Sequence, residues 1–591
     1  MDRKKSVLLL VLLVLAAFAN ILSHDLFGDT QSIFLENTFY RNPAHITHLF
    51  QKDFNMDPTY LSTTLEGIAF SGCISYRPVT ALSFFADWAL WKDKPYGYAW
   101  DNILLHMLVT IAVFYLILRL TGQERWAFLA AAMFAVHPIQ SEAVNNVGYR
   151  SDMLCALFFV LSFLSYLQWR QRSTENKKGN AWLAASFLTF LPALFSKETA
   201  VTLPAVIVAY EFLRHQRLTR SLLKPFLGFT GILAFYFYIY LVVMPSRYYP
   251  KFFQVVENWG THFVDVIYIF FQYLKALFLP FTVSILPPLY LPQVDPAMIG
   301  ILFGGFTLFM ILIVIFIFKT ARPAPLLALG TMWFLVTYLP GSHLVPLPNP
   351  LAFRFLYLPS IGFFLVLSFF VFQAISWLEK KSPNIRWSFI VPMALIGWYL
   401  VYTIPTNEYF KNNIVVCREM VRRYPDSSRP YWILGLKALE RQNHDQAIDY
   451  FEKYRKTHIR SPFHIQPDKD FLTYFMLGRA YALQAEKAVA FLEKSIELNP
   501  SFAAGYLELA RIHISQKKFT EAIQLAEKAI AIDPAWSPGY IYVIHSYVEL
   551  GEFKKAQAFL GQVKSLAPSN ADVQQVEQFF QERKLQQQEG L

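Results

Sequence analysis

The residues with the clearest capacity for chemistry are acids that follow the first apolar run of the chain. Residues 6–23 carry no charge, and the stretch HDLFGDTQSIFLEN, residues 24–37, comes directly after them. Its acids are Asp25, Asp29 and Glu36. A carboxylate that is ionised at neutral pH and held at the membrane face could act as a general base. The same acids could also be ordinary polar residues of a solvated loop.

Basic residues near the ends of later apolar runs form a second set. They are Arg77, Arg150, Lys197 and Arg354. Arg and Lys bind phosphate through charge-assisted hydrogen bonds, so these residues predict a phosphate site with a carboxylate available as base. Each has a structural alternative: Arg77 and Arg354 as interfacial anchors, and Lys197 with Glu198 as a polar turn.

Further polar residues lie where apolar helices are expected to begin or end. Asn102 and His106 are four residues apart and therefore share a helical face. Ionisable groups within or beside membrane spans are costly, which makes each of them a hypothesis of function. The candidates for a substrate pocket are Asn102, His106, His137, Glu142 and Glu198. The alternative is that His106 is a satisfied core histidine and that His137, before a proline, belongs to a helix end.

The cysteines do not predict a metal site. Cys73, Cys155 and Cys417 lie far apart and form no CxxC pair. This spacing argues against a zinc site or a disulfide framework, although one oxidised pair stays open. The sequence requires no divalent metal and predicts no certain cofactor.

The elements that must hold these residues follow from the apolar composition. Of the 591 residues 55% are hydrophobic and 16% are charged, an apolar excess too large for a soluble globular protein. Runs such as 223–244, 301–318 and 355–378 are long enough to cross about 30 Å of hydrocarbon as helices. The net charge of +11 lies mostly in short loops beside these runs, so cytoplasmic loops explain it better than nucleic-acid binding.

The positions of the Lys/Arg-rich connectors predict about eleven spans, with the N-terminus inside and the C-terminus outside. The spans are expected near residues 6–23, 99–118, 126–138, 152–169, 182–196, 199–213, 223–244, 298–318, 323–340, 354–378 and 387–404. Residues 264–288 are apolar enough for one more crossing, which would turn the C-terminus inward. Lys275 and the prolines after it favour helices that lie at the interface or re-enter. The first run also fits a cleavable signal peptide, which leaves the topology unchanged.

The last part of the chain is a predicted repeat domain. Pro500, Pro534 and Pro568 are 34 residues apart, the period of the tetratricopeptide (TPR) repeat. Residues 474–500 read as a shortened unit and residues 431–454 as a divergent first unit. Aromatic, apolar and small residues occupy the packing positions of the repeat at Tyr506, Leu509, Ala510, Ala522, Ala526 and Ala529. Such arrays bind peptides or partner proteins, or form a stalk or a dimerisation surface.

The predicted organisation is all-α. It has a polytopic membrane domain over 1–405, whose first exported loop is 24–98, a linker helix over 406–429, and a TPR α-solenoid over 430–591.

The whole chain resembles a family of membrane glycosyltransferases of the GT-C fold, the transmembrane-and-TPR O-mannosyltransferases, and looks like a bacterial member. The resemblance rests on GDTQSIFLEN, SYRPVTALSF, NILLHML, FAVHPIQSEAVNNVGYRSDMLCALFFVLSF, SKETAVTLPAVIVAYE and RFLYLPSIGF, followed by the TPRs. The HPIQSEAV segment with the residues after it is the most specific of these stretches.

The resemblance implies inverting transfer of a mannose-like sugar from a polyprenyl-phosphate donor to a hydroxyl, typically of a protein Ser or Thr. It places the reaction on the exported face of a bacterial inner membrane, with the TPR domain on the periplasmic side. The general base of such enzymes aligns with Asp29. The candidates for stabilising the leaving phosphate are Arg77, Arg150, Lys197 and Arg354, with Arg354 first.

Two positions depart from the family pattern. An acid is expected directly after Asp29, where this chain has Thr30, and a Glu is expected before Arg354, where it has Phe353. These departures leave open a different donor preference or weak activity. The competing hypotheses are a non-catalytic TPR scaffold for envelope assembly and a lipid-linked sugar transferase that acts on a glycan or a lipid.

Overall fold

The computed structural model describes residues 2–27, 38–50, 77–175, 177–215, 222–243, 259–283, 296–347, 351–458, 471–535, 537–567 and 570–589. The predicted base Asp29 and its neighbour Thr30 lie outside these ranges. The chain divides into two compact units, Met1–Tyr424 and Pro425–Leu591. Within the described ranges every regular element is a helix, which confirms the predicted all-α class.

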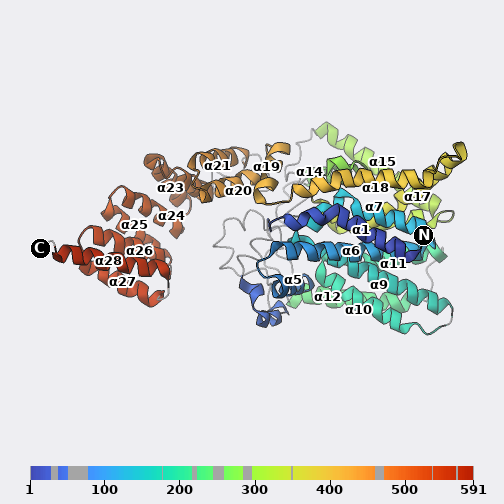
Figure 1. The fold of residues 1–591 in the computed structure, drawn as a ribbon, viewed down its shortest axis with the longest axis horizontal. Coiled ribbons are helices and arrows are strands. Elements are labelled where there is room, and N and C mark those ends of the chain that lie inside the picture. Colours follow the sequence, from blue (N-terminus) through green and yellow to red (C-terminus); the bar gives the residue numbers. More distant parts are fainter. Residues whose placement is uncertain are drawn as a thin grey trace. The chain divides into compact units, whose positions relative to one another are not determined.

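The first unit is a bundle of long apolar helices joined by short helical turns (Figure 1). Its longer helices are α1 (Arg3–Phe18), α5 (Pro78–Trp91), α6 (Pro95–Thr121), α7 (Glu124–Val136), α9 (Arg150–Thr174), α10 (Asn180–Ser196), α11 (Leu203–His215), α12 (Leu223–Tyr238), α14 (Trp259–Phe278), α15 (Pro296–Thr320), α16 (Pro325–Tyr338), α17 (Pro359–Lys381), α18 (Trp387–Glu408) and α19 (Asn413–Arg423). Its short elements are η1 (Ala19–Ser23), η3 (Thr38–Arg41), η4 (Pro43–Phe50), η5 (Pro138–Gln140), α8 (Ser141–Asn145), η6 (Val147–Tyr149), η7 (Glu198–Thr202), η9 (Ile239–Val243), η10 (Pro280–Thr282), η11 (Leu339–Gly341) and η12 (Phe353–Leu356).

Seven described helices are long and apolar enough to cross a membrane. They are Arg3–Ser23, Pro95–Thr121, Val147–Thr174, Leu223–Val242, Ile299–Thr320, Pro359–Lys381 and Trp387–Glu408. A further pair, Glu124–Val136 with Pro138–Asn145, passes the same test but bends by 53°. The shorter apolar helices Asn180–Ser196 and Pro325–Gly341 coincide with two more predicted spans. The chain is therefore a multi-pass membrane protein, while the count of about eleven spans stays a prediction.

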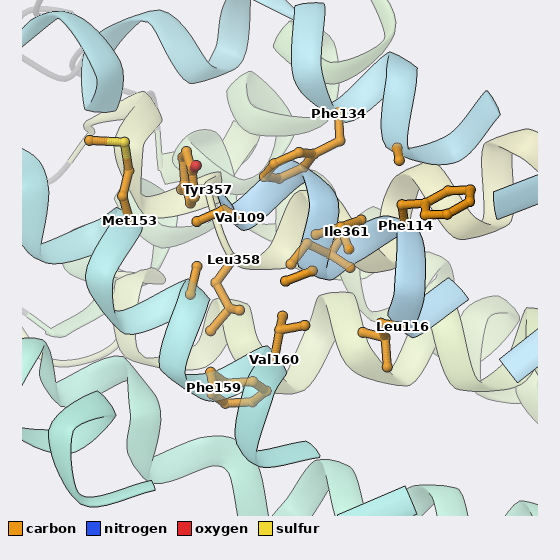
Figure 2. Close-up of a cluster of buried hydrophobic side chains, with 14 of the residues drawn as sticks. Val109, Phe114, Leu116, Phe134, Met153, Phe159, Val160, Tyr357, Leu358 and Ile361 are labelled. Atoms are coloured by element: carbon orange, nitrogen blue, oxygen red, sulfur yellow. The ribbon is translucent and has the colours of Figure 1, made fainter. Parts of the chain in front are cut away.

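The core of the first unit lies between α6, α7, α9 and the start of α17. Figure 2 shows side chains from these helices converging, among them Phe114 from α6, Phe134 from α7 and Phe159 from α9. In contrast, none of the apolar window of α15 is buried. An apolar helix with that exposure is suited to face lipid on most of its surface.

Small residues let neighbouring helices of the bundle approach closely. Ser162 of α9 and Ser186 of α10 exchange hydrogen bonds with each other's carbonyl oxygens at 2.7 and 2.8 Å. Where α16 crosses α17, a Cβ placed on Gly362 would clash with the carbonyl oxygen of Gly330 and lie 2.9 Å from the backbone nitrogen of Phe334. Such small-residue contacts are a common way to pack helices in a membrane.

The second unit is a series of antiparallel helix pairs. The pairs are α20 (Arg429–Glu440) with α21 (His444–His458), α22 (Phe471–Ala480) with α23 (Ala485–Leu498), α24 (Ala503–Ser515) with α25 (Phe519–Ile532), and α26 (Ser537–Glu549) with α27 (Phe553–Leu566), followed by α28 (Ala571–Glu589). Ala522, Ala526 and Ala529 are buried at the predicted packing positions. Gly435 lies against the ring of Phe451, and Gly478 lies against Leu492, so each small residue makes room for the partner helix of its own pair.

Candidate functional site

Four segments at helix ends bring three of the predicted cations together. Arg77 stands directly before α5, whose first residue, Pro78, needs no backbone hydrogen bond. Lys197 is extended (φ −159°, ψ 142°) because it separates α10 from η7. Asp152 lies in the first turn of α9, where a negative charge complements the helix dipole. Arg354 belongs to η12, just before α17.

Arg77 and Glu198 form the most exposed pair of this site. Nη2 of Arg77 donates to the two carboxylate oxygens of Glu198 at 2.8 and 3.0 Å. The two side chains are 22% and 39% exposed, so solvent reaches this pair. Burial alone would raise the pKa of Glu198, but the positive charges of Arg77 and Lys197 outweigh it and hold the pKa below its ordinary value. Glu198 is therefore a carboxylate at neutral pH.

Lys197 and Asp152 form a second, buried pair. Nζ of Lys197 donates to Oδ1 of Asp152 at 2.5 Å. Their side chains are 3% and 7% exposed. The ammonium also lies 4.8 Å from the centre of the Phe355 ring, within the range of a cation–π interaction.

Arg354 and Glu142 form a third pair, also buried. Nη1 of Arg354 donates to Oε1 of Glu142, and the backbone N–H of Arg354 donates to Oε2 at 3.1 Å. The guanidinium carbon lies 3.9 Å from the centre of the Tyr149 ring and 4.9 Å from that of Phe355. Among the described residues, Nε and Nη2 of Arg354 have no hydrogen-bond partner.

The three pairs are neighbours. The Phe355 ring lies beside both Lys197 and Arg354. Arg77 reaches the hydroxyl of Ser151, the residue before Asp152, at 3.4 Å. We call this group the ion-pair cluster, and its members are Arg77, Glu198, Lys197, Asp152, Arg354 and Glu142.

Arg150 has different surroundings from the other predicted cations. Its Nη1 lies 2.6 Å from Oδ2 of Asp87 and 3.3 Å from the hydroxyl of Ser83, both on α5. Its Nε donates to Oδ1 of Asn102 at 2.8 Å, and its Nη2 donates to the carbonyl oxygen of Tyr98 at 3.3 Å. Every nitrogen of this guanidinium therefore has a protein partner, and the contacts join α5, α6 and α9.

The residues predicted for a substrate pocket on α6 are also satisfied by protein partners. The amide of Asn102 donates to the carbonyl oxygen of Val144 at 3.0 Å. His106 is fully buried, with Nδ1 2.7 Å from the Tyr357 hydroxyl and Nε2 3.0 Å from the carbonyl oxygen of Ala135. These contacts favour the alternative of a core histidine.

His137 is held in a similar way at the bend between α7 and η5. Its Nδ1 accepts from the backbone N–H of Ile139 at 3.1 Å, and its Nε2 lies 3.2 Å from the carbonyl oxygen of Leu277. This side chain caps η5 and ties it to the end of α14.

The chain on the N-terminal side of the Asp29 loop is anchored to the end of the first unit. The backbone N–H of Asp25 donates to the carbonyl oxygen of Lys411 at 3.0 Å. Phe27 packs in one apolar cluster with Phe410, Val416 and Met420. Asp25 and Phe27 are therefore held against Lys411 and against the apolar cluster that includes α19.

Sequence reasoning did not assign roles to several residues that complete the cluster. Tyr149, Ser151 and Phe355 are adjacent in sequence to predicted cations, and that adjacency was an available signal; Asp152 was noted only as one of the ionisable groups of the predicted exported turn around Arg150. Asp87 lies inside the apolar helix α5, and an acid within an apolar run was the signal available for it. Within the described ranges, no three His, Cys, Asp or Glu side chains gather to hold a metal ion.

The comparisons with known proteins find a repeat family and a group of transferases. A family model described as tetratricopeptide repeat matches residues 484–540 and 514–578. Protein O-mannosyl-transferase TMTC3 of Mus musculus is 31% identical over 226 residues, which are 38% of this chain and 23% of the relative. Protein O-mannosyl-transferase TMTC2 of Mus musculus is 32% identical over 212 residues, 36% of this chain and 24% of the relative.

The chain is a homologue of these transferases. The matched part spans about a quarter of the length of the curated relatives. Among solved structures, the TPR protein YrrB aligns over 35% of this chain and 98% of its own at 14% identity, with a TM-score of 0.24. The structure of MamA aligns over 26% of this chain and 86% of its own at 20% identity, also with a TM-score of 0.24.

Proposed function

We propose that the chain is an integral-membrane glycosyltransferase. It transfers a mannose-like sugar from a polyprenyl-phosphate donor to a hydroxyl, a Ser or Thr of a protein, on the exported face of a bacterial inner membrane. The observation that carries this proposal is the ion-pair cluster, where two buried ion pairs and one partly exposed pair meet in a homologue of O-mannosyltransferases. Ionisable groups buried among membrane-spanning helices are costly and rare, which makes such a group of charges a hypothesis of function.

In this proposal Asp29 is the general base. Its carboxylate takes the proton of the acceptor hydroxyl while the hydroxyl oxygen attacks the anomeric carbon of the sugar. The bond between that carbon and the phosphate oxygen breaks, and polyprenyl phosphate leaves with both electrons. A single displacement of this kind inverts the anomeric centre.

Arg354 is the residue best suited to bind the leaving phosphate. Its Nη1 holds Glu142, while its Nε and Nη2 have no partner in the described structure. A planar guanidinium with two adjacent donors matches the oxygens of a phosphate. Charge that develops on the leaving oxygen can thus be stabilised by the protein's own cations.

In this proposal the second unit binds the acceptor protein. TPR helix pairs stack into a curved array whose surfaces bind extended peptides or partner proteins. On the exported side, such an array would hold an acceptor protein long enough for its hydroxyl residues to enter the site. This role predicts that acceptor use depends on the second unit more than donor binding does.

One observation favours a second candidate, a non-catalytic membrane scaffold. Each cation of the ion-pair cluster already has an acidic partner, which a purely structural network would also show. The experiment that separates the candidates compares cells with and without the gene by mass spectrometry of exported glycoproteins and lipid-linked sugars. Loss of exported O-linked sugar with a rise in unused lipid-linked donor is expected. Unchanged glycoproteins and donor pools would support the scaffold.

A further inference from the structure

Asp152, one of the acids of the ion-pair cluster, has a carboxylate oxygen for which the described structure gives no partner. Its Oδ1 accepts from Lys197, whereas its Oδ2 is buried and has no hydrogen-bond partner among the described residues. A buried carboxylate oxygen without a donor is costly. A bound ligand that brings a hydroxyl would remove that cost.

Lys197 has unused capacity at the same place. An ammonium carries three N–H donors, and the structure gives Nζ of Lys197 one acceptor among the described residues, Oδ1 of Asp152. Within the part of the chain that the structure describes, the pair thus has an unused acceptor on Asp152 and unused donors on Lys197. One hydroxyl can use both, because it donates through its hydrogen and accepts through its oxygen.

The chemistry of the pair selects against other ligands. A phosphate carries no proton to offer Oδ2 and would be repelled by the carboxylate. A metal ion would meet the ammonium of Lys197, which lies 2.5 Å from the same carboxylate. A neutral hydroxyl is repelled neither by the carboxylate of Asp152 nor by the ammonium of Lys197.

The aromatic rings beside the pair strengthen this preference for a neutral ligand group. Phe355 lies 4.8 Å from Nζ of Lys197, and both Phe355 and Tyr149 lie beside Arg354. These rings are part of the apolar surroundings of the pair, in which a neutral ligand group costs less to bury than an ion.

We propose that Asp152 and Lys197 together bind one hydroxyl of the donor sugar and thereby select the sugar, while Arg354 binds its phosphate. This assignment rests on the proposed function. It makes Asp152 a specificity-determining residue and changes the role of Lys197 from a phosphate ligand to a sugar ligand.

The test measures binding of polyprenyl-phosphate mannose and of each of its monodeoxy analogues to the detergent-solubilised full chain. Wild type is expected to bind one analogue about tenfold to a hundredfold more weakly than the full donor, the loss typical of one charge-assisted hydrogen bond. Asp152→Asn should bind the full donor more weakly by a similar factor and no longer distinguish it from that analogue. Asn keeps an oxygen for Lys197 but offers N–H groups where the hydroxyl needs an acceptor.

The control is Glu211→Gln. Glu211 is a fully buried carboxylate paired with Arg170, whose Nε lies 2.9 Å away, and Arg170 is near the end of α9 opposite to Asp152. This control should keep the wild-type discrimination among the analogues. If Asp152→Asn keeps it as well, the assignment is overturned while the proposed function stands. If wild type binds no polyprenyl-phosphate sugar, the proposed function fails and the assignment fails with it.

Discussion

Arg354 and Arg150 are both buried guanidiniums paired with a carboxylate, yet their remaining donors differ. Arg150 uses all of its nitrogens on α5 and α6. Arg354 leaves Nε and Nη2 without a partner in the described structure and stacks on Tyr149. We therefore expect Arg354 to bind ligand and Arg150 to hold the fold.

Replacing Arg150 tests this division. Arg150→Ala would leave the buried carboxylate of Asp87 without its cation, which should lower the free energy of unfolding by about 3–5 kcal/mol. Denaturant unfolding of the purified protein measures this free energy. The control is Arg322→Ala, which replaces an exposed arginine and should leave the stability unchanged. Arg354→Ala leaves the buried carboxylate of Glu142 without its cation in the same way, and it should in addition reduce donor binding. Full stability of Arg150→Ala together with lost donor binding would contradict the structural role.

The charge of Glu198 predicts a pH dependence. Its folded-state pKa is lowered by Arg77 and Lys197 despite burial, so its contribution to stability is present above the unfolded pKa of about 4.3 and is lost as the pH falls through the lowered value. The melting temperature of wild type should therefore fall more steeply than that of Glu198→Gln in this acidic range. If the melting temperatures of the two proteins fell with pH at the same slope, the ion pair between Glu198 and Arg77 would be contradicted.

At the scale of elements, the sequence predicted the helices and the repeat units, because local patterns along the chain indicate both. Apolar runs predicted most of the long helices, and the prolines 34 residues apart predicted the TPR units that the family model matches. The contacts between distant segments could not be predicted. Lys197 and Asp152 are 45 residues apart, and Arg354 and Glu142 are 212 apart, so their pairing depends on how the helices pack.

The crossing of α16 and α17 provides a test of that packing. Gly362→Ala places a methyl group against the backbone of α16, and overpacking of this kind should lower the free energy of unfolding by about 1–3 kcal/mol. Because α17 follows directly on η12, donor binding should weaken too. Gly397→Ala on α18 is the matched control, since a Cβ there meets nothing within 4 Å. Equal stability of both variants would contradict the close crossing.

At the scale of the whole molecule, each of the two compact units has its own core. α19, which ends at Arg423, lies directly before the second unit and packs against Phe27. Phe27 and the α19 residues Val416 and Met420 thus belong to one apolar cluster of the first unit. The sequence contained no signal for this contact between Phe27 and α19.

Deletion of residues 426–591 separates the roles of the two units. The remaining chain keeps the ion-pair cluster, so we expect near-normal binding of polyprenyl-phosphate mannose and a large loss of transfer to protein acceptors. Donor binding and acceptor transfer are measured on the same preparation, after a cooperative unfolding transition has shown that the shortened chain is folded. An equal loss of both activities would contradict a recruiting role for the TPRs.

The most direct test of the central claim is transfer by the purified full chain from polyprenyl-phosphate mannose to Ser- or Thr-containing acceptors, with the anomeric configuration of the product determined by NMR. Wild type should release polyprenyl phosphate and form an inverted glycosidic bond. Asp29→Asn should be about 10²–10⁴-fold slower while it folds and binds donor normally. Near-normal transfer by Asp29→Asn, or a product with retained configuration, would contradict the account.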